Sequence, residues 1–215
     1  MKDPAPISPL AVHIVDDEDV LRDSLAFLFA SRGIATRCWE SGEAFLAAWP
    51  QIDCGCIILD VRMSGLSGPQ VHDALVQRAG EVCILPPVIF LTGHADVPLA
   101  VRSLKGGAYD FLEKPFNDNQ IVDLALRAME AYRSRSREIG GRAEIRARLS
   151  SLSAREAEVM DLVLKGEMNK QIADHLGISM RTVEVHRARM LQKMGAKNSV
   201  ELAQIVARLP DEGHP

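Results

Sequence analysis

The sequence has no apolar run that approaches the roughly 20 residues needed to cross a bilayer. Residues 1–10 hold one lysine and three prolines but no long apolar stretch, so we do not expect a signal peptide. The composition also excludes a disordered or fibrous chain, because 47% of the residues are apolar and 25% are charged. We therefore expect a globular cytoplasmic protein with no membrane partner, and 215 residues suffice for two domains.

Cysteines are few, and all four lie in the first half, beside or within apolar runs: Cys38, Cys54, Cys56 and Cys83. In a reducing compartment such cysteines are expected to be free thiols. The Cys54-Gly-Cys56 pair could suggest a metal site. A zinc site needs further ligands at suitable spacing, however, and no such partner stands close by in the sequence.

Charge is distributed unevenly along the chain. Residues 1–128 carry 10 basic and 17 acidic side chains, a net charge of −7, whereas residues 129–215 carry 15 and 12, a net charge of +3. This contrast is typical of an acidic module joined to a nucleic-acid-binding module, although chance surface composition is the alternative.

The first half alternates short apolar strands with amphipathic helices. Strands are predicted at 11–15, 34–39, 56–59, 87–91 and 109–112. Helices are predicted at 18–32, 41–49, 70–78 and 97–105, with a fifth that starts near 118 and continues past Met129. Five such units with nearly continuous apolar strands predict an α/β fold, a flavodoxin-like doubly wound five-stranded parallel sheet.

Polar residues follow the predicted strands at the edge where such sheets bind ligands. They are Asp16, Asp17, Asp60, Thr92 and Lys114. Three carboxylates in one crevice repel each other unless a cation lies between them, and Mg²⁺ prefers such oxygen ligands. With a lysine and a hydroxyl beside them, they predict a site for a phosphoryl group. The alternative is a set of solvated acidic loops.

The segment 132–150 differs from what surrounds it. It is rich in Arg, Ser, Glu and Gly, and Gly140-Gly141 is predicted to interrupt it. We predict a charged helical extension followed by a flexible linker at 129–148. This divides the chain into a first domain at 1–128, with its core at 11–128, and a second at 149–215.

The last part of the chain predicts helices and no strand. Ser153 and Glu156 have the spacing of a capping box, which starts a helix that runs to Lys165. Further helices are predicted at 170–176, 180–194 and 199–208, with glycines between them. The pattern indicates an all-α four-helix domain that contains a helix-turn-helix.

Residues 11–128 resemble the receiver domain of two-component response regulators. The resemblance is carried by His13-Ile-Val-Asp-Asp-Glu18, Leu59-Asp-Val-Arg-Met63, Leu91-Thr-Gly93 and Glu113-Lys-Pro-Phe116. It implies that Asp60 accepts a phosphoryl group from a histidine kinase, with Thr92 and Lys114 touching the phosphoryl oxygens.

The resemblance also implies a metal site and a switch. Asp17, Asp60 and the backbone carbonyl of Arg62 would bind Mg²⁺, with Asp16 acting through water. Phe111 falls at the family's aromatic switch position, and Lys114-Pro115 is the peptide that the family usually holds in cis. One position departs from the family, which normally has proline where this chain has Ser64. The loop is therefore expected to be less constrained.

Residues 149–209 resemble the LuxR-type DNA-binding domain. The resemblance is carried by Leu152-Ser-Ala-Arg-Glu156, Asn169-Lys-Gln-Ile-Ala173, Leu176-Gly-Ile-Ser179, Arg181-Thr-Val-Glu-Val-His186 and Lys193-Met194. The order of receiver, linker and LuxR-type domain is most similar to the FixJ branch of the family.

Helical spacing divides the third helix of this domain into two faces. Val183, Met190, Leu191 and Met194 share the face that is predicted to be core. The opposite face gathers Arg181, Glu184, Val185, Ala188 and Gln192, with Arg189 beside them. That face can enter a DNA major groove.

Each polar residue near this face has an expected contact. Glu184 can accept a hydrogen bond from cytosine, and Val185 can touch a thymine methyl group. Arg181, Arg189, Lys193 and Lys170 suit phosphates, and Thr182 and Asn169 can add neutral phosphate bonds. Arg187 lies near the core face, so it either reaches a phosphate or meets the partner domain.

Together these features predict a phosphorylation-dependent transcription regulator, an activator by resemblance, that dimerises when phosphorylated and works with RNA polymerase. Phosphorylation would move Thr92 toward the new oxygens, let Phe111 turn inward, and repack a surface around Val97, Ala100, Val101 and Leu104. Those four residues could instead be ordinary helix core. Two rival functions are an aspartyl-phosphate hydrolase, which would need a substrate-covering cap, and a degenerate receiver that works without phosphate.

Overall fold

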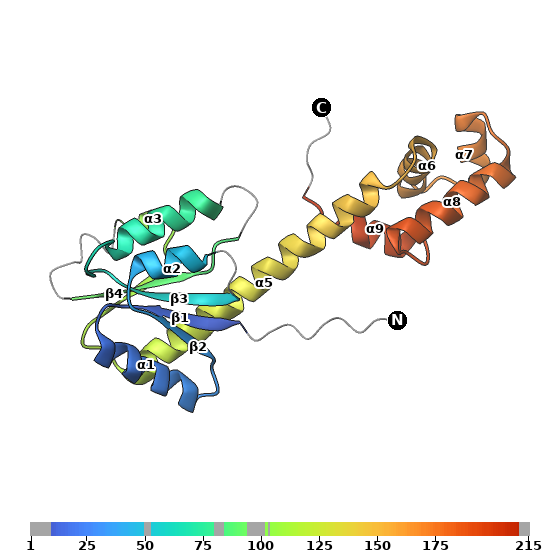
Figure 1. The fold of residues 1–215 in the computed structure, drawn as a ribbon. Coiled ribbons are helices and arrows are strands. Elements are labelled where there is room, and N and C mark those ends of the chain that lie inside the picture. Colours follow the sequence, from blue (N-terminus) through green and yellow to red (C-terminus); the bar gives the residue numbers. More distant parts are fainter. Residues whose placement is uncertain (1–9, 50–52, 80–83, 94–101, 103, 211–215) are drawn as a thin grey trace. The chain divides into compact units, whose positions relative to one another are not determined.

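The computed structural model describes residues 10–49, 53–79, 84–93, 102 and 104–210 (Figure 1). The chain forms two compact units, residues 1–136 and 137–215. Within the described ranges, no helix is both long enough and apolar enough to span a membrane. Cys38, Cys54 and Cys56 are free thiols, as predicted, whereas Cys83 lies outside the described residues.

The first unit is built on a five-stranded sheet, in which every pairing is parallel. Its strands are β1 (Ala11–Val15), β2 (Thr36–Trp39), β3 (Cys54–Asp60), β4 (Val88–Thr92) and β5 (Asp110–Glu113), in the order β2-β1-β3-β4-β5. The buried strands β1, β3 and β4 are nearly continuous apolar runs, because helices cover a parallel sheet on both faces. The predicted fold class is confirmed.

Helices cover both faces of this sheet (Figure 1). Phe29 of α1 (Asp19–Ser31) and Ile121 of α5 (Asp118–Ser150) belong to one core cluster. Phe45 of α2 (Gly42–Ala48) and Leu75 of α3 (Gly68–Ala79) belong to the other. The three central strands between them are therefore buried, and the acidic residues Asp16 and Asp60 lie at strand ends.

The predicted helix at 97–105 lies largely outside the described residues. So do Val97, Ala100 and Val101, three of the residues expected on the switch surface. The fourth, Leu104, is partly buried and packs against the core cluster that contains Phe45.

The helix α5 corrects the prediction of a flexible linker. It runs without interruption from Asp118 to Ser150, so the expected break at Gly140-Gly141 was wrong. Two helical glycines cost about 1 kcal/mol each relative to alanine. Helix-favouring residues surround them. The ion pair Glu138–Arg142 spans them at 2.6 Å, and Glu144–Arg148 forms a second pair in the following turn at 2.8 Å.

The second unit contains the four predicted short helices: α6 (Ala154–Leu164), α7 (Asn169–Leu176), α8 (Met180–Met194) and α9 (Ser199–Val206). Ser153 and Glu156 form the expected capping box at the start of α6. Gly177 and Gly195 end α7 and α8 in the left-handed conformation, with φ of 63° and 69°. The capping box and the glycine ends are thus confirmed, whereas α7 begins at Asn169, one residue before its predicted start, and α9 ends at Val206 rather than at 208.

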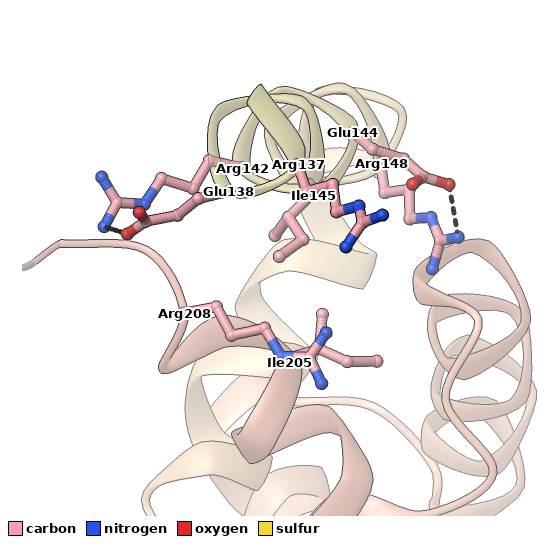
Figure 2. Close-up of a pocket in the computed structure, with 9 residues that line it drawn as sticks. Arg137, Glu138, Arg142, Glu144, Ile145, Arg148, Ile205 and Arg208 are labelled. Carbon is pink, nitrogen blue, oxygen red and sulfur yellow. Dashed lines mark hydrogen bonds and ion pairs between the residues drawn. The ribbon is translucent and has the colours of Figure 1, made fainter. Parts of the chain in front are cut away.

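The last turns of α5 pack as part of this second unit. Ile145 is 7% exposed and joins the core cluster of α6 to α9, and Arg148 donates to the carbonyl of Met194 over 2.8 Å. A cleft of about 520 Å³ lies beside them, lined by α5 residues together with Ile205 and Arg208 (Figure 2). The apolar contacts around Ile145 are what anchor this end of a highly charged helix.

Candidate functional site

Strand register brings three of the predicted polar residues together. Asp16 follows β1, Asp60 ends β3, and Lys114 follows β5. The Lys114 Nζ lies 2.5 Å from Asp60 Oδ1 and 3.1 Å from Asp16 Oδ2. Both carboxylates are buried, at 1% exposed for Asp16 and 7% for Asp60. One ammonium group therefore bridges two buried carboxylates, which leaves a net negative charge in the pocket.

Burial and the neighbouring charges shift the pKa values of Asp60 and Lys114 in opposite directions. Burial raises the pKa of Asp60, and the contact with Lys114 offsets that shift only in part. Burial alone would lower the pKa of Lys114, but its contacts with Asp60 and Asp16 together outweigh burial and raise it. Lys114 is therefore a permanent cation in this pocket.

Backbone groups fix the direction of the two buried carboxylates. The N–H of Arg62 donates to Asp60 Oδ2 over 2.8 Å, and the N–H of Glu18 donates to Asp16 Oδ1 over 2.8 Å. The sequence did not point to Gly68 as part of the site. In the structure, a Cβ at this position would lie 2.3 Å from the carbonyl oxygen of Asp60. Only glycine allows α3 to begin so close to the end of β3.

Asp17 has a charge interaction with Lys114 but is hydrogen-bonded to the loop after β3. Its Oδ2 accepts hydrogen bonds from Ser64 N over 2.8 Å and from Ser64 Oγ over 3.0 Å. The backbone hydrogen bond from Ser64 is the main reason that the pKa of Asp17 is lowered. The structure thus brings Asp16, Asp60 and Lys114 together but turns the third predicted carboxylate toward the loop after β3.

The chemistry of these ligands fits Mg²⁺, because all the donors are hard oxygens. Among the described residues, however, no three acidic, histidine or cysteine side chains converge closely enough to form a metal site as they stand. Asp17 differs from the other two carboxylates because its Oδ2 accepts two hydrogen bonds from Ser64. The residue types suit a divalent ion, and an ion that took Asp17 Oδ2 as a ligand would displace the two hydrogen bonds from Ser64.

Thr92 and Phe111 occupy the positions expected of them. Thr92 ends β4, is 1% exposed, and donates its hydroxyl to the carbonyl of Gly93 over 3.1 Å. Phe111 is half-buried on β5 and packs against the core cluster that contains Phe45. The Lys114-Pro115 peptide is cis, as the resemblance implied.

His13 lies in the same motif as the acidic pair but belongs to the core. Its Nδ1 accepts from Trp39 Nε1 over 2.9 Å, and its Nε2 faces the carbonyl of Asp53 at 3.3 Å. Burial lowers the pKa of His13 to about 4, so the ring is neutral and donates from Nε2. It supports β1 and takes no part in the pocket.

In the second unit, α8 has the two faces that helical spacing predicts. Val183, Met190 and Met194 are buried, and Leu191 is half-buried against them. The opposite face is exposed and consists of Arg181, Glu184, Val185, Ala188, Arg189 and Gln192. We call this set the α8 face; it presents two arginines and one carboxylate to solvent.

Of the other predicted DNA-contact residues on α7 and α8, some are exposed and others are already hydrogen-bonded within the unit. Lys170 is exposed on α7, near the start of the helix. Thr182 and Ser179 share a 2.8 Å hydrogen bond between their hydroxyls at the start of α8. Arg187 donates to Asn169 Oδ1 over 3.0 Å, so it connects α8 to α7. A phosphate accepts hydrogen bonds, so it would bind the amide Nδ2 of Asn169 rather than the Oδ1 that Arg187 uses.

Lys193 is engaged within the unit itself. Its Nζ lies 2.6 Å from Glu156 Oε2 and 2.9 Å from the carbonyl of Ser151. The side-chain hydrogen bond from Lys193, with the backbone N–H of Ser153, lowers the pKa of the buried Glu156 to about 2. These contacts fasten α8 to α6, so Lys193 is less available to a phosphate than Lys170.

Comparison with known families and proteins gives consistent matches to both units. Residues 12–126 match the response regulator receiver domain family, and residues 150–206 match the bacterial regulatory proteins of the luxR family. The chain is 66% identical to the C4-dicarboxylate transport transcriptional regulatory protein DctR of Rhodobacter capsulatus. The match extends over 194 residues, which are 90% of this chain and 98% of that protein.

Further relatives cover the chain to a similar extent. The transcriptional regulatory protein FixJ of Rhizobium meliloti is 44% identical over 194 residues, 90% of this chain and 93% of that protein. Among solved structures, the response regulator StyR is 33% identical with a TM-score of 0.83, covering 93% of this chain and 98% of that chain. Full-length FixJ from B. japonicum is 38% identical, with a TM-score of 0.57 over 92% and 96% of the two chains.

Proposed function

The chain belongs to the response-regulator family, as a transcriptional regulator with a receiver domain and a LuxR-type DNA-binding domain, and we propose that phosphorylation of Asp60 switches its DNA binding. Phosphorylation-dependent regulation is typical of this family. One observation carries the residue assignment. Asp60 is the carboxylate that ends the central strand β3, with Oδ1 held by Lys114 and Oδ2 by the N–H of Arg62.

The transfer forms an acyl phosphate. A carboxylate oxygen of Asp60 attacks the phosphorus of a phosphohistidine on a histidine kinase, an O–P bond forms, and the N–P bond to the kinase breaks. Lys114 and the hydroxyl of Thr92 would then bind the new phosphoryl oxygens. Asp17, Asp60 and the Arg62 carbonyl would hold Mg²⁺, with Asp16 acting through water, and the ion would supply positive charge to offset the transferred group.

The added charge is the start of the switch. The acyl phosphate carries about two negative charges where the Asp60 carboxylate carried one, so the pocket becomes more negative and Lys114 alone cannot balance it. Movement of Thr92 toward the new oxygens would free space for Phe111, which now packs half-buried on the sheet. We propose that this repacking promotes a homodimer and that the unphosphorylated protein is mainly monomeric, because one helix-turn-helix reads only a half-site.

For DNA, we propose that the α8 face enters the major groove. Glu184 and Val185 would contact base edges, with Ala188 beside them. The phosphate contacts would come from Arg181, Arg189 and Lys170, with Thr182 and Asn169 adding neutral bonds and Lys193 only if it leaves Glu156. The corresponding division of the chain is a receiver at 1–128, a connecting helical segment at 129–148 and a DNA-binding domain at 149–215.

The cellular setting follows from these proposals. The protein would act in the cytoplasm with a cognate histidine kinase, promoter DNA and RNA polymerase as partners.

The 66% identity to DctR favours promoters of C4-dicarboxylate transport genes as targets. Binding to such a promoter fragment, compared with a shuffled fragment of equal length, checks this target; equal affinity for both would contradict it.

Intact-mass measurement tests the residue assignment. The full chain and the Asp60→Ala variant are incubated with Mg²⁺ and a small phosphodonor. The wild type should gain the mass of one phosphoryl group, and Asp60→Ala should gain none. If the wild type gains no mass but binds the promoter, the rival degenerate receiver holds. If the wild type turns over a phosphate ester many times, the rival hydrolase holds.

A further inference from the structure

The loop after β3 contains a contact that the usual family residue could not make. Ser64 donates both its backbone N–H and its hydroxyl to the same oxygen, Oδ2 of Asp17, over 2.8 and 3.0 Å. The family normally has proline at this position, and proline has neither an N–H nor a hydroxyl. Both hydrogen bonds are therefore a consequence of having serine at position 64.

We propose that Ser64 competes with Mg²⁺ for Asp17, so that this receiver needs a higher Mg²⁺ concentration to fill its metal site than it would without Ser64. The inference rests on the proposed function, in which Mg²⁺ binds beside Asp60. It assigns Ser64 as a positioning residue that sets the metal affinity of the pocket.

The competition follows from the direction of the Asp17 carboxylate. To act as a metal ligand together with Asp60, Asp17 must face the pocket in which Lys114 bridges Asp60 and Asp16. Its Oδ2 instead faces the loop, and no metal-binding group of acidic side chains forms among the described residues. Turning Asp17 toward the ion breaks or lengthens the two bonds to Ser64, and this cost is subtracted from the binding free energy of the metal.

The loop is held in place independently of Asp17, so Ser64 does not simply follow the carboxylate. Glu43 of α2 accepts from the N–H of Leu66 over 2.9 Å. Gly65 has a φ of 81°, and a Cβ there would lie 2.5 Å from the Glu43 carboxylate. Hydrogen bonds thus hold this loop at the position where the family has proline.

The test is calorimetric titration of the full-length wild type and variants with MgCl₂. Ser64→Ala removes the hydroxyl and keeps the N–H, whereas Ser64→Pro removes both donors. Ser64→Ala should lower the Kd for Mg²⁺ about three- to ten-fold, the worth of one hydrogen bond, and Ser64→Pro by more. Mn²⁺ binding followed by electron paramagnetic resonance gives a second readout that needs no phosphorylation.

Ser67→Ala is the matched control. Ser67 lies in the same loop and also donates from both its N–H and its hydroxyl, but to Gln70 Oε1, over 2.9 and 2.8 Å. It should bind Mg²⁺ with the wild-type Kd. Equal Kd values for all four proteins, or weaker binding by Ser64→Ala, would overturn the role of Ser64 and leave the proposed function intact.

One further result would contradict the proposed function as well as the role of Ser64. If none of the four proteins binds Mg²⁺ or Mn²⁺, the metal site fails, and the competition fails with it. Circular dichroism of each variant without metal checks folding. Should Ser64→Pro not fold, Ser64→Ala against Ser67→Ala still decides the question.

Discussion

The two units place their functional charges in opposite surroundings. In the receiver unit, Asp16 and Asp60 are buried and both contact Lys114. On the second unit, the charged residues of the α8 face, Arg181, Glu184 and Arg189, are exposed to solvent. The buried pocket therefore depends on a few strong charge interactions, whereas the exposed α8 face would depend on many weak ones.

The difference matches what each unit has to do. In a buried pocket the effective dielectric constant is low, so one added phosphoryl group changes the local energy enough to move neighbouring side chains. DNA phosphates instead attract exposed cations and release counterions, so affinity accumulates from many contacts and depends on salt. Each unit also holds an exception: exposed Asp17 in the first, and the buried Glu156 that contacts Lys193 in the second.

The largest effect should come from removing the buried cation. Lys114→Met leaves Asp16 and Asp60 without their counter-charge and should lower the free energy of unfolding of the receiver unit by about 3–5 kcal/mol. Denaturant unfolding followed by tryptophan fluorescence measures this unit alone, because Trp39 and Trp49 are the two tryptophans in the sequence. Lys105→Met, at an exposed lysine, is the control; equal midpoints for both variants would contradict the buried-charge account.

On the exposed side, single charges should alter DNA recognition and leave stability nearly unchanged. Glu184→Ala should change preference at one base position by about 1–3 kcal/mol. Lys170→Ala should weaken binding to all sequences and reduce the salt slope by about 1. Fluorescence anisotropy on a set of single-base variants, with exposed Glu158→Ala of α6 as the control, measures both. Identical effects of the first two variants on every sequence would refute the α8 face assignment.

The buried Glu156 of the second unit should make the stability of that unit depend on pH in the acid range. The lowered pKa of Glu156, about 2 against an ordinary 4.5, means that its ionised form stabilises the fold. That stabilisation is complete above pH 4.5 and is lost as the pH falls toward 2. Thermal unfolding by circular dichroism should therefore show a smaller loss between pH 7 and pH 3 for Glu156→Gln than for the wild type. The same pH dependence in both, with exposed Glu158→Gln as reference, would exclude this role.

The smallest effect concerns the charged part of α5. A Cβ at Gly140 or Gly141 would meet no atom within 4 Å, so alanine at either position should stabilise the second unit by about 0.5–1 kcal/mol. Gly195→Ala should do the reverse, because Gly195 has a φ of 69° and a Cβ there would lie 2.5 Å from Arg148. Circular dichroism melting measures both. Destabilisation by Gly140→Ala would mean that α5 is not continuous in solution.

The sequence predicted what depends on local pattern. Apolar runs gave the strands of a parallel sheet, and the topology of such sheets selected Asp60, Thr92 and Lys114 for one edge. Capping residues such as Ser153 marked the start of a helix. The failure at Gly140-Gly141 has the same origin, since helix-breaking tendency is local, whereas the packing of Ile145 that helps hold the helix is tertiary.

What the sequence could not predict are contacts between distant side chains. The hydrogen bonds between Ser64 and Asp17 depend on the path of a loop. The Lys193–Glu156 pair depends on how α8 crosses α6, and spacing on α8 alone suggested a phosphate contact instead. In both cases the residue type was noticed, but its partner needed three-dimensional structure.

The central claim is that the buried pocket controls the exposed α8 face. Its most direct test is the affinity of the full chain for promoter DNA, by fluorescence anisotropy at fixed salt and Mg²⁺, before and after treatment with a small phosphodonor. The account predicts that phosphodonor tightens DNA binding by the wild type and leaves Asp60→Ala unchanged. Equal affinity of the wild type before and after phosphorylation, or the same gain in Asp60→Ala, would contradict it.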